Sequence, residues 1–209
     1  MDWAHDLHDS ATVRRARDAV SIDEPWRLIE RFAELVRESG SEDERTAARY
    51  LEERLGSFGI EPVVYEPELY LSVPRSCTLT ILGERPESLE CKVPAFSRST
   101  DGLEGELVEV ATAAISGTGD LFQSSADIDP AQVSGKIVIA DGYAMPKVVG
   151  QLQRAGAAGA IFVNPGHAHE GIITDIWGTP GLGERHRIPD FTALAVPQAA
   201  GEALRARLA

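Results

Sequence analysis

Two histidines lie two residues apart in the segment Gly166-His-Ala-His-Glu170, and Asp175 follows five residues later. In an extended chain His167 and His169 would share a face, because alternate side chains point the same way. Imidazole and carboxylate groups bind zinc, so Glu170 or Asp175 can complete a ligand shell. However, catalytic zinc sites usually draw ligands from several rigid elements, and these residues share one loop. A hydrogen-bonding histidine pair that holds the loop is therefore favoured over a metal site.

Other residues with catalytic side chains lack the arrangement that catalysis needs. The terminal segment His5-Asp-Leu-His-Asp9 has ligand types but lies in a polar terminus, where fraying is the default. His186 lies between two arginines and is best explained as part of a solvated turn. The chain contains no Gly-x-Ser-x-Gly motif, and Gly135-Lys136 precedes a strand rather than a phosphate-binding helix. We therefore assign no catalytic residue.

The glycine-rich loop beyond the histidines carries large apolar side chains. Ile173, Ile176 and Trp177 are the candidate interaction residues, because an exposed loop seldom carries so much apolar surface. The loop either packs on its own domain or contacts another surface. Packing within the domain is favoured, because most large apolar side chains belong to a core.

Cys77 and Cys91 are the only cysteines, and no Cys-x-x-Cys pair exists. Two cysteines are too few for a disulfide scaffold. One bridge between them is an open alternative, but two ordinary buried thiols are favoured.

The clearest element pattern is a strand, an amphipathic helix and a second strand. Ile137 to Ile139 form an apolar β-branched run, Val148 to Ala155 recur at helical spacing before Gly156, and Ala160 to Val163 form the next strand. Further strands are expected over 105–110 and 188–196, and a final helix over 198–209. This alternation of strands and helices indicates a mixed fold, α/β (α+β), with short flanking helices.

The first third of the chain predicts a helical hairpin and two strands. One helix begins at Asp23 and carries an apolar stripe to Val36, and a capping box, Ser41-Glu-Asp-Glu44, starts a second helix that ends near Gly59. Strands are expected over 61–71 and 76–82, with a turn at 85–88. We predict a polar lead over 1–24, the hairpin and strands over 25–90, and a second domain over 91–209.

The net charge of the chain excludes some classes of binding partner. The 209 residues carry 20 Lys and Arg against 33 Asp and Glu, a formal net charge of −13. A field of that sign repels nucleic acid and anionic lipid, so neither is an expected partner. The first residues lack the basic and apolar regions of a signal peptide, and no apolar run reaches the ~20 residues of a membrane span. We expect a cytoplasmic protein.

Several motifs in order resemble the protease-associated domain. They are Ser134 to Asp141, Ala155 to Asn164, the stretch from His169 to Pro180, and Ile188 to Val196. The hairpin sequence from Ser41 to Leu51 also resembles the start of zinc-dependent aminopeptidases and related glutamate-carboxypeptidase-like enzymes. The resemblance implies a β-sandwich or barrel-like core, preceded by the beginning of a peptidase domain.

In that family zinc ligands and a glutamate base follow the inserted domain, and no residue here matches them. The resemblance therefore implies a non-catalytic N-terminal portion of a zinc metallopeptidase, whose protease-associated domain shapes or covers the substrate cleft. Zinc is implied only for the complete enzyme, and we expect no activity from this chain alone. Expected partners are a peptide substrate or the missing catalytic domain, and self-association is possible. The alternative is a stand-alone protein-interaction module.

Overall fold

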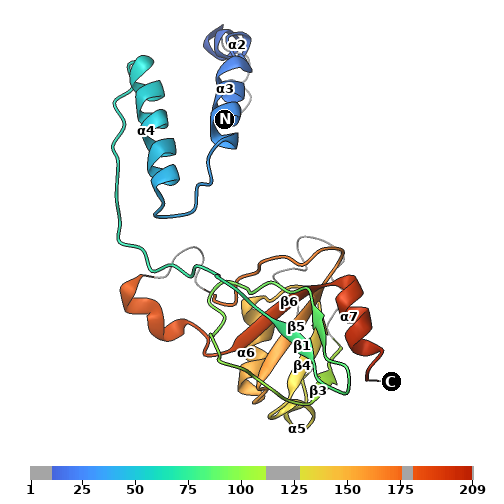
Figure 1. The fold of residues 1–209 in the computed structure, drawn as a ribbon. Helices are drawn as coiled ribbons and strands as arrows, with labels where there is room; N and C mark the ends of the chain where they lie inside the picture. Colours follow the sequence, from blue (N-terminus) through green and yellow to red (C-terminus); the bar gives the residue numbers. More distant parts are fainter. Residues whose placement is uncertain (1–10, 112–127, 176–180, 209) are drawn as a thin grey trace, which may run out of the picture. The chain divides into compact units, whose positions relative to one another are not determined.

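A computed structural model describes residues 11–111, 128–175 and 181–208 (Figure 1). The chain divides into two compact units, Met1–Pro67 and Glu68–Ala209.

The first unit contains α2 (Ala11–Asp18), α3 (Asp23–Ala33) and α4 (Glu42–Ser57). The predicted hairpin of α3 and α4 is confirmed: Arg54 Nη2 lies 2.6 Å from Glu24 Oε2, and the Phe32 and Tyr50 rings meet edge to face. However, the expected continuation of α3 to Val36 is wrong. The Val36 amide donates to the Asp43 carboxylate at 2.8 Å, so it no longer continues the helical ladder.

Local sequence signals set both ends of α4. The Glu44 amide donates to Ser41 Oγ at 3.0 Å, as a capping box predicts, whereas the Glu44 carboxylate accepts from the amide of Gly40, one residue before the cap, at 2.5 Å. At the other end the Ile60 amide donates to the Leu55 carbonyl, and the Gly59 amide donates to the Gly56 carbonyl. Gly59 has a φ of +76°, the left-handed conformation that this Schellman ending requires.

The strand predicted over 61–71 is wrong, because the structure forms none there. Instead β1 (Leu79–Ile81), within the expected 76–82, pairs antiparallel with β2 (Glu87–Leu89). The second strand overlaps the turn predicted at 85–88. Leu79 pairs with Leu89, which aligns apolar residues on one face of this two-stranded ribbon. This cross-strand pairing outweighs the local sequence preference for a turn.

The second unit is built on a four-stranded parallel sheet of order β3-β4-β5-β6. The strands are β3 (Leu107–Glu109), β4 (Ile137–Asp141), β5 (Gly159–Asn164) and β6 (Thr192–Pro197). The predicted strand–helix–strand unit is confirmed as β4, α6 (Pro146–Arg154) and β5. Every residue of β5 is buried, as expected of a parallel strand covered on both faces. The remaining helices are α5 (Pro130–Val133), the 3₁₀ helix η2 (Leu182–Arg187) and α7 (Gln198–Arg205).

Alternate strand residues face two separate apolar clusters. Val138 and Phe162 belong to the cluster that contains the buried residues of α6, and Ile139 and Val163 belong to the cluster that contains those of α7, against which the β1–β2 ribbon also packs. The α/β class is therefore confirmed, with strands layered on strands where the ribbon covers the sheet. The ribbon precedes the predicted boundary at residue 91, and it lies within the compact unit Glu68–Ala209.

None of the helices in the described ranges combines the length and apolar content that crossing a bilayer requires.

Candidate functional site

The histidine loop leaves β5 at a buried asparagine. Asn164, 1% exposed, donates from Nδ2 to the Gly142 carbonyl at 2.6 Å, and its Oδ1 accepts the His169 amide at 2.6 Å. The His169 ring lies 5.7 Å from the ring of Tyr143, centroid to centroid. These contacts anchor the loop through Asn164, a residue whose role the sequence analysis missed.

The acidic residues proposed to complete a zinc shell have cationic neighbours instead. Glu170 lies 3.3 Å from Lys92 Nζ, and Asp175 lies 3.3 Å from Arg187 Nη2. Within 11–111, 128–175 and 181–208, no three His, Cys, Asp or Glu side chains are grouped to hold a metal. The described residues therefore do not fit a zinc site. The other histidine cluster, His5 and His8, lies outside the described residues.

The three candidate interaction residues fall in two categories. Ile173 is completely buried in the cluster on the α6 side, and its amide donates to the Ala95 carbonyl at 3.3 Å. Ile176 and Trp177 lie outside the described residues. Of this set, the structure places only Ile173, and it packs within its own unit.

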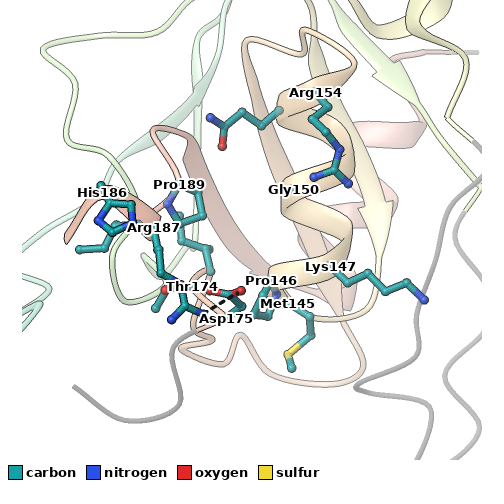
Figure 2. Close-up of a pocket in the computed structure, with 13 residues that line it drawn as sticks. Met145, Pro146, Lys147, Gly150, Arg154, Thr174, Asp175, His186, Arg187 and Pro189 are labelled. Atoms are coloured by element: carbon teal, nitrogen blue, oxygen red, sulfur yellow. Dashed lines mark hydrogen bonds and ion pairs between the residues drawn. The ribbon is translucent and has the colours of Figure 1, made fainter. Parts of the chain in front are cut away.

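A half-open cavity of about 760 Å³ lies between α6 and the end of η2 with the two residues after it (Figure 2). It is lined by α6 residues from Pro146 to Arg154, by residues 173–175, and by residues 186–189. This cavity could not be predicted from the sequence, because its walls come from three separated segments whose charged residues are typical of solvated surfaces.

Cationic groups predominate among the charged residues lining this cavity. Arg187 bridges Asp175 and Glu184, and the hydrogen bond to Asp175 is the first cause of a raised Arg187 pKa. Arg154 runs back along α6 toward Gly150, and Lys147 extends away from the η2 side (Figure 2). Among the described lining residues none is Ser or Cys, Thr174 carries the one aliphatic hydroxyl, and the carboxylate of Asp175 is ion-paired. Such a cavity suits ligand binding better than nucleophilic catalysis.

The PA domain family profile matches residues 103–204, from just before β3 to the last turn of α7. This segment is a PA domain. The resemblance inferred from the sequence is thereby confirmed, although the β1–β2 ribbon that completes the core lies outside the matched residues.

Two solved structures are similar in fold to a larger part of the chain than the PA domain alone. An aminopeptidase from Aneurinibacillus sp. strain AM-1 gives a TM-score of 0.55 at 23% identity, covering 90% of this chain and 41% of its own. A peptidase M28 precursor from Shewanella amazonensis SB2B gives 0.53 at 20% identity, covering 88% and 43%. At these identities the likeness concerns the fold, and the chain spans about two fifths of either structure. No curated protein matches the chain in sequence.

Proposed function

We propose that this chain is the non-catalytic N-terminal portion of a zinc metallopeptidase of the aminopeptidase type. In this proposal the PA domain shapes or covers the substrate cleft, and residues outside the chain bind zinc and supply the general base. The observation that carries it is the extent of the structural likeness. The PA profile matches 103–204, whereas the fold of a solved aminopeptidase covers 90% of the chain and so includes most of the first unit.

The apolar surface of the first unit supports the same proposal. Trp26 and Ile29 of α3 are 55% and 57% exposed, and Phe58 after α4 is 60% exposed. Two isolated helices bury little apolar surface between them. Exposed apolar side chains on an amphipathic hairpin therefore indicate that another domain covers them. The peptidase part that would supply this cover is the first partner we propose, and a peptide substrate is the second.

Zinc belongs to the proposed complete enzyme and not to the residues described here. The described residues hold no ligand set, so no chemical step is assigned to them. Their proposed role is steric and electrostatic, and it is exercised on the peptide that enters the cleft.

The direct test compares this chain with a version extended into the downstream coding sequence. With zinc or cobalt added, the 209-residue chain should release no product from aminoacyl chromogenic substrates, and the extended version should be active. Activity of the short chain would overturn the proposal.

A second test addresses the role of the PA domain. In the extended enzyme, Arg187→Ala should change KM for peptides long enough to reach the cavity, with kcat preserved. The same variant should leave turnover of a single-residue chromogenic substrate unchanged, and Arg14→Ala serves as the matched surface control. Equal effects on both substrates would argue against a steering role.

The alternative proposal is a stand-alone PA-type interaction module. The cationic cavity beside α6 favours it, because such a site can bind a peptide without any catalytic domain. A stand-alone module should be monodisperse in light scattering, whereas an uncovered first unit should self-associate in proportion to concentration. The variants Trp26→Ser and Ile29→Ser should abolish that self-association.

A cytoplasmic location is part of either proposal, and cell fractionation tests it.

A further inference from the structure

The two cysteines flank the β1–β2 ribbon symmetrically. Leu79 pairs with Leu89, so two residues further out the same antiparallel register places Cys77 opposite Cys91. Residues two apart share a face of a strand, so both thiols lie on the face that carries Leu79 and Leu89. Cys91 packs against the apolar cluster of that face.

The side chains meet across the ribbon. The two Sγ atoms lie 3.3 Å apart, with Cys91 as donor, and Cys77 Sγ donates to the Cys91 carbonyl at 3.2 Å. Both residues are half-buried. Directly opposite residues of an antiparallel pair have β-carbons about 4.5–5.5 Å apart, close to the separation in a disulfide, so the bond can form without a change of register.

We propose that Cys77 and Cys91 are a redox pair that closes into an intrachain disulfide by exchange with a low-molecular-weight disulfide. The sequence favoured two separate buried thiols, and the cross-strand register is what argues for the pair.

The exchange proceeds in two balanced steps. The Cys77 thiolate attacks one sulfur of the small disulfide, forms a mixed disulfide and releases one small thiolate. Cys91 then loses its proton and attacks the Cys77 sulfur, which forms the intrachain bond and releases the second thiolate. The two protons from the cysteines end on the two released thiols, so the protein loses two electrons and the small disulfide gains them.

The geometry assigns the first attack to Cys77. Burial, followed by the hydrogen bond with Cys77, raises the pKa of Cys91 to about 12, so this thiol keeps its proton. Cys77 Sγ accepts the hydrogen bond from Cys91, so the sulfur that reacts first already lies against the sulfur that attacks it in the second step. Cys91 is thus the resolving cysteine.

The bond would hold the ribbon at its open end. Lys92, next to Cys91, exchanges two backbone hydrogen bonds of 2.8 Å with Ala195 of β6. A bridge at Cys91 therefore connects the chain entering at Cys77 to the edge of the main sheet. Three-residue strands gain most from such a restraint, because few ladder bonds hold them.

The test incubates the intact chain with excess oxidised glutathione to equilibrium, followed by acid quenching and mass spectrometry. We expect loss of two hydrogens, two thiols protected from alkylation after denaturation, and a peptide joining Cys77 to Cys91. The oxidised chain should unfold at a temperature about 5–10 °C higher than the reduced chain, because the bridge closes a loop that contains the whole ribbon.

A matched control moves one thiol to the opposite face. The double variant Cys91→Ser, Glu90→Cys keeps two cysteines at almost the same spacing, but residue 90 faces solvent. It should retain glutathione as a mixed disulfide at least tenfold more than the unmodified chain does. The proposal is overturned if the unmodified chain keeps two alkylatable thiols, stops at the mixed disulfide, or bridges only between chains.

Discussion

Between residues 11 and 67 the structure describes one buried apolar residue, Ala47, whereas both faces of the sheet in the second unit carry fully buried side chains. Of the nineteen large hydrophobic side chains exposed in the described residues, twelve precede residue 68. Since burial of apolar surface is the main force that stabilises a fold, the second unit holds a core and the first holds none.

The two units nevertheless share the same local signals. Both α4 and α6 end in a Schellman motif with a glycine of positive φ, Gly59 in one and Gly156 in the other. A helix cap determines where a helix ends and contributes about 1 kcal/mol. A hydrophobic core, in contrast, requires apolar surfaces that face one another. Well-formed helix caps therefore do not indicate whether a segment folds as an independent domain.

The largest expected effect comes from separating the units. A fragment of residues 68–209 should unfold in one cooperative transition, because it contains both apolar clusters. A fragment of residues 1–67 should lose signal gradually on heating, without a sigmoidal step. Far-UV circular dichroism measures both, and a cooperative transition in the shorter fragment would erase the contrast between the units.

A pair of phenylalanine substitutions compares the same chemical change in the two units. Phe162 is completely buried in β5, so Phe162→Ala should reduce the free energy of unfolding by about 3–5 kcal/mol. Phe58 is 60% exposed and contacts the Arg54 guanidinium, so Phe58→Ala should cost under about 1 kcal/mol. Urea denaturation of the whole chain measures both, and equal costs would mean that Phe58 is covered.

Two glycines in helices make a finer comparison. At Gly201 of α7 an added β-carbon would clash with Val163 Cγ1 and lie 2.6 Å from Cγ2, so Gly201→Ala should destabilise by about 1–3 kcal/mol. At Gly56 of α4 nothing lies within 4 Å, so Gly56→Ala should stabilise the helix by about 0.5 kcal/mol. The Gly201 result is measured by urea denaturation and the Gly56 result by helix content. A neutral Gly201→Ala would mean that α7 does not pack closely on β5.

Local patterns predicted those elements whose partners lie nearby in the sequence. The β-branched run at Ile137, the helical spacing from Val148 and the stop at Gly156 all lie in one short segment, and the structure follows them. The capping box at Ser41 and Glu44 is another such case. In each, the interaction that decides the structure joins residues a few positions apart.

Features that depend on distant partners could not be predicted in this way. Val63 and Val64 have strand-forming side chains, but no neighbouring strand pairs with them in the described residues, and β propensity alone fixes no strand. The cavity beside α6 and the meeting of Cys77 with Cys91 depend on tertiary packing and on strand register. The sequence lists the residue types but not these distances.

The smallest expected effect concerns an exposed ion pair of the first unit. The hydrogen bond from Arg49 Nη2 to Glu42 Oε1, 2.9 Å long, is the first cause that lowers the pKa of Glu42. A carboxyl whose folded pKa is lowered contributes stability above its unfolded pKa and loses it as the pH falls through the folded pKa. Arg49→Gln should therefore move the Glu42 titration midpoint upward, as measured by carboxyl NMR.

Arg45→Gln is the matched control for this change, because Arg45 lies 3.4 Å from the same carboxylate and acts mainly through charge. Its effect on the midpoint should be smaller than that of Arg49→Gln, and the reverse order would contradict the assigned cause. Solvent screens a fully exposed pair, so neither variant should change the unfolding of the second unit. The electrostatics of the first unit would then be local, like its helix caps.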